Sequence, residues 1–279
     1  MTPLSQRLAL LSADEMVSAL GMRRAPRPLR RGLTVPFLAL SRRLSQVLSQ
    51  LDDAVDRVGL PAAARKALED FGVGLRVSGE PSPNGGCLVL ANHPGAYDAL
   101  ALMSALGRED LLILAADRAF LRALPSLSRH LVFVGDSATG RALALRRAAT
   151  CLRRGGAVLH FPAGKIEPDA DFEVNRSRLL EPWRPGVAAL LAAAERSSAS
   201  VLVAGVRGVH SPRAKRFLLN RLAERQGITT LSPLLQIVGK LRDVVTRVHV
   251  GPAGDARRCS KDAEHVALRE RLRTAIARA

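Results

Sequence analysis

The stretch CLVLANHPGAYDALALM, residues 87–103, is the most informative part of this chain about its fold class. Its first five residues form a short apolar run, which is typical of a buried strand. Pro94 and Gly95 then break the extended path, and the apolar run that opens at Asp98 predicts a helix. A buried strand that leads through a turn into a helix is the building unit of α/β folds, and we therefore expect that fold class.

The same alternation of short apolar runs and Ala-, Leu- and Arg-rich segments continues through the rest of the chain. Strands are predicted near residues 87–91, 111–115, 131–134, 157–161, 201–206 and 244–250. The earlier part of the chain instead predicts helices, near residues 4–20, 33–57 and 60–71. We therefore predict an α/β fold with a mixed central sheet flanked by helices, and with a helical N-terminal arm.

The boundary of the arm is expected at PSPNGG, residues 81–86, because clusters of Pro, Ser, Asn and Gly mark loops. The predicted domains are a helical arm over 1–80 and an α/β domain over 81–279. The arm carries an apolar stretch, Leu33 to Leu40, between arginines on both sides. Basic residues beside apolar ones suit a contact with anionic lipid. Packing of this stretch on the α/β domain explains it equally well, and both interpretations stay open.

His93 and Asp98 place an imidazole and a carboxylate five positions apart, directly after a predicted strand. The turn between them can fold the carboxylate back onto the ring. An Asp that accepts a hydrogen bond from one ring nitrogen fixes the tautomer and leaves the other nitrogen free to take a proton. This chemistry requires no metal, and the sequence predicts none. Asp98 is also suited to the first turn of a helix, so the pair alone is a weak signal.

A second block, AVLHFPAGK at residues 157–165, strengthens that signal. It is another short apolar run, and it ends in a Pro/Gly turn and a cation, Lys165. In open α/β sheets, ligands collect beyond the carboxyl ends of the strands. We therefore expect the second turn at the same edge of the sheet as His93. His160, within the run, is predicted to be a structural residue of a buried strand.

The two blocks together resemble the motifs of the glycerolipid and phospholipid acyltransferase superfamily. The first motif of that family is a His, four variable residues and an Asp, met here from His93 to Asp98. Its third motif is usually Phe-Pro-Glu-Gly, met here as FPAG at residues 161–164, and WRPGVAALL at residues 183–191 is similar to the stretch that follows. The resemblance spans about residues 85–210, and it is closest to members with Ala in the Glu position.

The chain departs from the family pattern at two further places. The second motif has an Arg shortly after a strand, whereas residues 131–134 run into Gly135 and Asp136, and the next arginine is Arg141. The fourth motif usually has a Pro, which the stretch 201–207 lacks. The loop at residues 135–140 predicts either a helix capped by Ser137 or Thr139 or a set of amides that bind phosphate.

The resemblance implies an O-acyltransferase similar to 1-acylglycerol-3-phosphate acyltransferases. It would move a fatty acyl group from a thioester donor, acyl-CoA or an acyl-carrier protein, to a lysophospholipid or glycerol-phosphate-type acceptor, without a cofactor. His93 would act as the general base and Asp98 would orient it. The residues implied in substrate binding are Phe161, Pro162, Gly164, Lys165 and Arg207.

Composition limits the partners of the chain. Its 279 residues carry a formal net charge of +17, which would attract anionic lipid headgroups, acidic carrier proteins or nucleic acid. Aromatic residues make up only 3% of the chain, too few for base-stacking platforms, and this disfavours nucleic acid. The chain also lacks the Gly-x-Ser-x-Gly elbow of many hydrolases.

Cysteine usage and hydropathy indicate the compartment. The 3 cysteines are isolated in sequence, which fits a reducing cytoplasm, and no apolar run reaches the roughly 18 residues that span a bilayer. We expect a cytoplasmic protein peripherally associated with the inner face of the cell membrane. The alternative function is a noncatalytic lipid-binding or membrane-surface protein that retains the acyltransferase fold.

Overall fold

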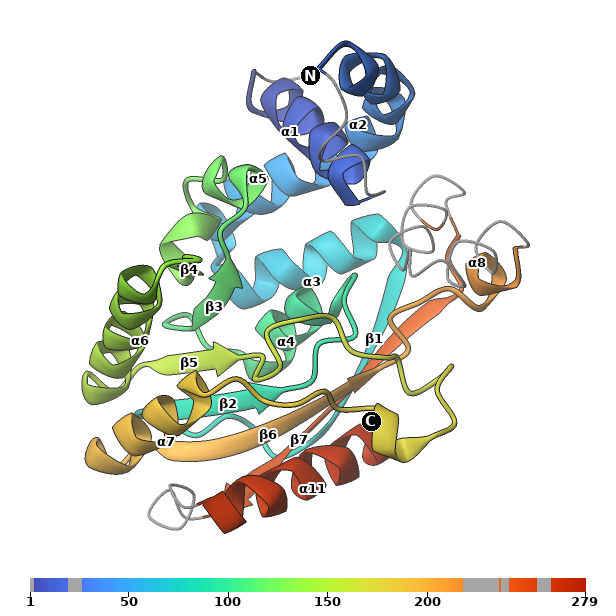
Figure 1. Cartoon of the computed structure of the whole chain (residues 1–279). Helices are drawn as coiled ribbons and strands as arrows, with labels where there is room; N and C mark the ends of the chain where they lie inside the picture. Colours follow the sequence, from blue (N-terminus) through green and yellow to red (C-terminus); the bar gives the residue numbers. More distant parts are fainter. Residues whose placement is uncertain (1–2, 20–26, 218–235, 237–240, 255–261) are drawn as a thin grey trace. The chain divides into compact units, whose positions relative to one another are not determined.

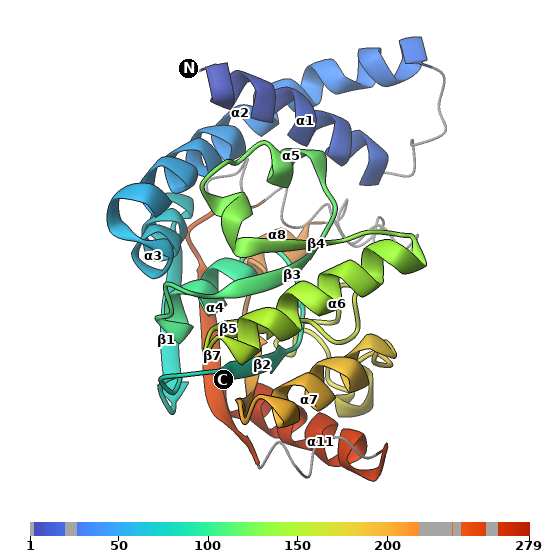
Figure 2. The same ribbon diagram turned by 90° about the vertical axis from the view of Figure 1, so that its left-hand side faces the viewer.

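The computed structural model describes residues 3–19, 27–217, 236, 241–254 and 262–279. Figures 1 and 2 show the ribbon of the chain from two sides. The contacts within the chain divide it into two compact units. The first unit comprises residues 1–74, 118–128 and 210–244, and the second comprises residues 75–117, 129–209 and 245–279.

The second unit contains nearly all of a seven-stranded sheet with the order β1-β7-β6-β2-β5-β3-β4. The strands are β1 (Val73–Gly79), β2 (Cys87–Ala91), β3 (Leu112–Ala116), β4 (Leu131–Val134), β5 (Ala157–His160), β6 (Ser200–Arg207) and β7 (Val244–Gly254). The pairs from β6 through β2, β5 and β3 to β4 are parallel, whereas β6 and β7 are antiparallel. The predicted mixed α/β sheet is therefore confirmed.

Strand β2 lies in the middle of the parallel part of the sheet. All five of its residues are fully buried, as expected for a strand covered on both faces. It pairs with β5 on one side and with β6 on the other, so the carboxyl ends of three parallel strands meet at one edge. The turn that contains His93 begins at the centre of this edge.

Helices cover both faces of the sheet in the second unit. They are α4 (Asp98–Leu106), α6 (Ala138–Arg153), α7 (Gly186–Arg196) and α11 (Asp262–Arg278), with α4 above the sheet and α7 and α11 below it in Figure 1. A buried apolar cluster joins α6, α7 and α11 to the strands. Strand β6 and α11 approach so closely at Gly205 that an added Cβ would lie 2.2 Å from the backbone of Ala275.

The first unit is helical. It contains α1 (Pro3–Ala19), α2 (Arg27–Val58), α3 (Leu60–Phe71), α5 (Ala119–Arg122) and α8 (Pro212–Arg216). The buried Asp52 joins α2 to the turn after α5, because its carboxylate accepts hydrogen bonds from the backbone N–H groups of Ser126 and Leu127 at 2.9 and 2.8 Å. The predicted helical N-terminal arm is confirmed as secondary structure.

The structure differs from the sequence-based expectation at the end of the arm. Residues 73–79, expected within the arm, form strand β1 at the edge of the sheet, and the first unit also includes segments from later in the chain. The stretch Leu33 to Leu40 lies in α2, but nearly all of its side chains fall outside the described residues. Among the helices that the structure describes, none combines the length and apolarity needed to cross a membrane.

Candidate active site

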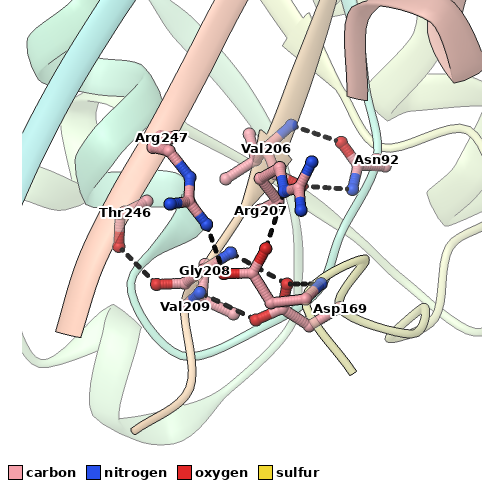
Figure 3. Close-up of polar contacts among 9 residues, drawn as sticks. Asn92, Asp169, Val206, Arg207, Gly208, Val209, Thr246 and Arg247 are labelled. Atoms are coloured by element: carbon pink, nitrogen blue, oxygen red, sulfur yellow. Dashed lines mark hydrogen bonds and ion pairs between the residues drawn. The ribbon is translucent and has the colours of Figure 1, made fainter. Parts of the chain in front are cut away.

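Asn92 anchors the turn that follows β2. Its side chain is fully buried, and it pairs with the backbone of β6 as another peptide group would (Figure 3). The Asn92 Nδ2 donates to the carbonyl of Val206 at 2.8 Å, and the N–H of Val206 donates to Asn92 Oδ1 at 2.7 Å. This joint extends the β2–β6 pairing by one step and fixes the position from which His93 leaves the sheet.

His93 and Asp98 lie in direct contact. His93 Nδ1 is 2.7 Å from Asp98 Oδ2, so the turn folds the carboxylate back onto the ring. Asp98 also accepts from the N–H of Gly95 at 2.7 Å and from the N–H of Ala99 at 2.5 Å. The His93 side chain is 30% exposed and that of Asp98 only 2%, so the ring reaches solvent while its partner does not.

The turn requires unusual backbone conformations. Gly95 has φ +87°, and Ala96 has φ +51°, which is uncommon for a residue with a Cβ. The two residues reverse the chain between His93 and the first turn of α4. Since the N–H of Gly95 bonds to Asp98, the same carboxylate that holds the ring also holds this strained turn.

The second sequence block lies beside the first, as predicted. Strands β2 and β5 are parallel neighbours, with Leu90 opposite His160 in the register. The rings of His93 and Phe161 are therefore close, with centroids 4.4 Å apart and a tilt of 31°. Phe161 is buried and forms one wall against the imidazole.

Glu167 is a buried carboxylate that holds the backbone of His93. The N–H of His93 donates to Glu167 Oε2 at 2.9 Å, and the N–H of Glu167 donates back to the carbonyl of His93 at 2.7 Å. The other carboxylate oxygen accepts from the N–H of Glu181 at 2.8 Å. Glu167 thus fixes the peptide of His93, whereas Asp98 fixes its ring.

The two carboxylates and burial together set the protonation of this site. Burial lowers the pKa of His93, but attraction to Asp98, the hydrogen bond to Asp98 and the charge of Glu167 together raise it above its ordinary value of 6.5. Burial raises the pKa of Glu167 to about 7, although backbone hydrogen bonds from His93 and Glu181 act in the opposite direction. Two groups in contact thus both have a pKa above their ordinary values.

The turn after β5 is held by Arg184. The backbone N–H of Arg184 donates to the carbonyl of Pro162 at 2.9 Å, and its Nε donates to the carbonyl of Ala163 at 3.3 Å. Gly164 has φ +62°, a left-handed conformation that favours glycine, and an added Cβ would touch the Arg184 side chain. Ala163, in the position of the family's Glu, is buried.

The two predicted anion-binding residues each pair with a carboxylate. Lys165 Nζ lies 2.9 Å from Glu181 Oε2, and both side chains are partly exposed. Arg207, at the end of β6, donates through Nε to Asp171 Oδ1 at 2.7 Å. Arg247 of β7 contacts the second oxygen of Asp171, so this carboxylate lies between two arginines.

Asp169 holds the same loop to the end of β6. Its buried carboxylate accepts from the N–H groups of Gly208 and Val209, both at 2.8 Å (Figure 3). Sequence reasoning missed Asp169 as well as Asn92, Glu167, Asp171 and Arg184. The sequence does carry a signal for the acids, because acidic residues occupy positions 167, 169, 171 and 173 of a chain with a net charge of +17. Acidic residues are outnumbered by basic ones in this chain, so their regular spacing indicates that they bond to specific groups of the protein.

Two residues outside the site, Ser137 and His160, have structural roles. Ser137 caps α6, since its Oγ accepts from the N–H of Gly140 at 3.0 Å, which supports the capping interpretation of that loop. His160 has both ring nitrogens buried without a hydrogen-bond partner among the described residues, and burial lowers its pKa to about 4. Within the part of the chain that the structure describes, no cluster of three or more His, Cys, Asp or Glu side chains is placed to hold a metal ion.

The arrangement supplies a partly exposed imidazole whose second nitrogen, Nε2, is left without a role in the His93–Asp98 contact. It lies at the edge of a parallel sheet, where ligands of α/β proteins bind. A basic nitrogen held in this way suits proton abstraction from a hydroxyl or amine. Cationic side chains on the neighbouring segments suit an anionic group on the molecule that carries that proton.

Comparisons with known proteins agree with this geometry. Residues 74–206 match the protein family described as Acyltransferase. The fold is similar to the crystal structure of the 1-acyl-sn-glycerophosphate acyltransferase PlsC from Thermotoga maritima, with a TM-score of 0.51 and 16% identity over 98% of this chain and 96% of that chain. No curated protein sequence matches the chain significantly. The matched stretch carries His93, Asp98 and the Phe161 turn, so the residues of the candidate site lie in the part of the chain that is similar to the Acyltransferase family.

Proposed function

We propose that this protein transfers a fatty acyl group from a thioester donor to a hydroxyl of a lysophospholipid or glycerol-phosphate-type acceptor, as a 1-acylglycerol-3-phosphate acyltransferase does. The observation that carries the proposal is the 2.7 Å contact of His93 Nδ1 with Asp98 Oδ2, at the edge of a sheet in an acyltransferase domain. The acceptor class is supported by the similar Thermotoga maritima protein, which is a 1-acyl-sn-glycerophosphate acyltransferase.

In the proposed reaction His93 is the general base. Its Nδ1–H donates to Asp98, so Nε2 carries the lone pair that takes the proton of the acceptor hydroxyl. The oxygen attacks the thioester carbonyl, a C–O bond forms, and the C–S bond then breaks. The imidazolium returns its proton to the leaving thiolate, while Asp98 stabilises the positive ring. The products are an ester and a free thiol.

The substrate-binding part of the proposal rests on the turn after β5 and on the end of β6. Phe161 and Pro162 form the wall beside the imidazole, and Gly164 lets the acceptor approach the backbone. Lys165 and Arg207 bind the phosphate of the acceptor. Both cations already face a carboxylate, so a phosphate joins or replaces that partner.

The donor and the location are also proposals. Acyl-CoA and an acyl-carrier protein both present a thioester to the same base, and both are anionic partners for a chain with a net charge of +17. The reaction requires no cofactor beyond these substrates. A basic protein whose acceptor is a lipid acts as a peripheral protein at the inner face of the cell membrane, in the cytoplasm.

A second candidate function is noncatalytic lipid binding by the same fold. Two observations favour it. Ala163 stands where the family usually has Glu, and Gly135 and Asp136 follow β4 where the second motif has an Arg. A binding protein retains lipid without releasing thiol from a thioester, so the two functions separate on turnover.

The test is thiol release from palmitoyl-CoA and from an acylated carrier protein, with and without lysophosphatidic acid, other lysophospholipids and glycerol 3-phosphate. We expect acceptor-dependent release by the wild type and a loss of about 10²- to 10⁴-fold in His93→Ala. His249→Ala, which removes a histidine from β7, is the matched control and should retain the wild-type rate. Equal turnover by His93→Ala and the wild type would falsify the mechanism, and lipid retention without any release would favour the binding protein.

A further inference from the structure

The segment between β5 and α7, residues 161–185, is a long loop whose only regular element is the short 3-10 helix η3 (Arg176–Arg178). It is drawn in yellow in Figure 1. Loops of this length inside a compact unit are usually functional. The first part of it, residues 161–165, forms the turn beside His93, and Glu167 and Arg184 hold that region in place. The outward-facing residues of the loop have no role in the proposed reaction.

Three acidic residues of this loop bond to other parts of the protein, whereas Glu173 accepts from the N–H of Asn175 within the loop. Glu167 is only 3% exposed, and Asp169 is only 4% exposed. Glu167 accepts from the N–H of His93, and Asp169 accepts from the N–H groups of Gly208 and Val209. Asp171, two positions further, bonds to Arg207 and Arg247. Three carboxylates at alternate positions therefore attach the loop to the sheet edge.

The large apolar residues of the same loop face outward. Ile166 is 51% exposed, Phe172 40% and Val174 95%. This is the reverse of the usual arrangement, in which apolar side chains are buried and carboxylates are solvated. Several large apolar side chains exposed on one short segment mark a surface that contacts another apolar phase.

Cationic side chains lie on the outer side of the loop. Arg176 and Arg178 are exposed, and Lys165 is half exposed. The carboxylates of Glu167 and Asp169 are turned inward, Asp171 is paired with two arginines, and Lys165 is paired with Glu181. The loop therefore presents Arg176 and Arg178 together with apolar side chains and the half-buried Glu173. That combination suits the interface of an anionic bilayer, where apolar groups enter the acyl region and cations contact the headgroups.

We propose that residues 165–178 form a membrane-contact loop that inserts Phe172 and Val174 into an anionic lipid surface, with Arg176 and Arg178 at the headgroups. Ile166 links this surface to the catalytic turn, because its side chain lies where a Cβ on Gly95 would come within 3.5 Å. A lipid acceptor therefore meets His93 at the edge of the membrane itself. The inference rests on the proposed function only in taking the acceptor to be a lipid.

The first experiment compares binding to sedimented vesicles of phosphatidylcholine with phosphatidylglycerol. The variant is the double substitution F172S/V174S, and the matched control is L143S/V266S, which removes two exposed apolar side chains from α6 and α11. We expect the partition coefficient to fall about tenfold or more in F172S/V174S, since apolar area is lost from the bilayer, and to stay within about twofold of the wild type in the control. No vesicle binding by the wild type, or equal binding by all three proteins, overturns the inference.

The second experiment locates the insertion directly. A tryptophan replaces Val174 in one protein and Leu143 in another, and both keep the native Trp183. Brominated lipids quench fluorescence only from rings within the acyl region. We expect added quenching in Val174→Trp and none in Leu143→Trp. Equal quenching in the two proteins contradicts insertion through the loop.

Two further readouts separate this inference from the proposed function. With a short-chain thioester and a water-soluble acceptor, F172S/V174S should release thiol at the wild-type rate, because neither residue is part of the catalytic site. Vesicle binding through the loop without any thiol release by the wild type would reject the enzyme and leave the loop intact. A dimeric wild type and a monomeric F172S/V174S in light scattering would show that the surface contacts a second copy of the chain, and would overturn the inference.

Discussion

At the scale of single residues, two carboxylates hold different parts of His93. Asp98 lies 2.7 Å from the ring nitrogen, and Glu167 lies 2.9 Å from the backbone nitrogen. The first contact sets which ring nitrogen is basic, and the second sets where the ring is placed. The proton affinity and the position of the base are thus controlled by separate side chains, and substitutions can separate the two effects.

Asp98→Asn tests the first effect. Attraction and hydrogen bonding to Asp98 raise the pKa of His93 against the effect of burial, so thiol release by the wild type should rise with pH through a value above 6.5. An amide lacks the charge, so in Asp98→Asn this rise should move to lower pH, and the maximal rate should fall by roughly 10²-fold or more. A pH–rate profile measures both, with Asp136→Asn in an exposed loop as the control. An unchanged profile in Asp98→Asn would contradict the assignment.

Glu167→Gln tests the second effect through stability. Burial raises the pKa of Glu167 from 4.5 to about 7, so the folded protein binds this proton more tightly than the unfolded chain does. The contribution is complete below 4.5 and is lost as the pH rises through about 7. The variant also places an NH₂ group against a backbone N–H, so it is the less stable protein overall.

The measurement is urea unfolding at several pH values. The gap in free energy of unfolding between the wild type and Glu167→Gln should narrow as the pH rises from 4.5 to about 7. Glu195→Gln on α7 is the reference for changes unrelated to this site. A gap that widens over this range would show that the ionised form of Glu167 is the stabilised one.

The residues of the site differ in how far the sequence predicts them. His93 and Asp98 can be predicted from the sequence because they are close in the chain and an imidazole beside a carboxylate suggests general-base chemistry. Glu167 cannot be predicted, because it contacts His93 across 74 positions and no local pattern requires that contact. The same holds for Asp171 and Arg247, which are 76 positions apart. Pairings of this kind depend on strand order, which the sequence pattern leaves open.

At the scale of elements, the joint between β2 and β6 positions the candidate active site. Asn92 is the last residue before His93, and its side chain completes the hydrogen bonding of Val206 inside the protein. A buried polar group without a partner raises the free energy of the folded state. Separation of Asn92 from β6 is therefore unfavourable, because it would leave the buried N–H and C=O of Val206 unpaired. The turn of His93 is therefore only as rigid as the β2–β6 pairing.

Asn92→Ala should be strongly destabilising. It leaves the buried N–H and C=O of Val206 without partners, at a cost of about 1–3 kcal/mol for each group. Asn175→Ala is the matched control, because Asn175 caps the exposed η3 and its loss should cost about 1 kcal/mol or less. Urea unfolding followed by circular dichroism measures both. Similar losses in the two variants would mean that the β2–β6 joint does not depend on Asn92.

The elements themselves were largely predictable. The expected strand near 87–91 coincides with β2, and that near 131–134 coincides with β4, because apolar runs of this length between turn residues are typical of buried strands. Strand β1 was missed. It is an edge strand whose last four residues are exposed, and it therefore lacks the continuous apolar run that identified the others.

At the scale of the whole molecule, charge and domain organisation follow different rules. The +17 net charge can be counted in the sequence. The division into two units cannot be read in the same way, because the first unit is assembled from three separate stretches of the chain. Composition and loop-forming residues report on residues that are close in sequence, whereas the first unit depends on contacts between distant segments.

The net charge predicts how lipid binding responds to salt. Binding of the wild type to anionic vesicles should weaken steeply as ionic strength rises, because exposed charges are screened beyond about 10 Å at 0.1 M salt. Binding through apolar insertion does not share this dependence, so a residual affinity should remain at high salt. Sedimentation with anionic and with neutral vesicles over a salt series measures the two parts. Affinity that is independent of salt would exclude a contribution from the basic surface.

The position of β2 in the sheet also determines when the turn of His93 can form during synthesis. Its partners are β5 and β6, and the bonds of Asn92 to Val206 span 114 positions. When β2 leaves the ribosome, neither β5 nor β6 has been synthesised, so this apolar strand has no pairing partner on either side. Pairings at such long range form slowly and expose the chain to aggregation. The pairings that position His93 are therefore complete only after residue 207 has been synthesised.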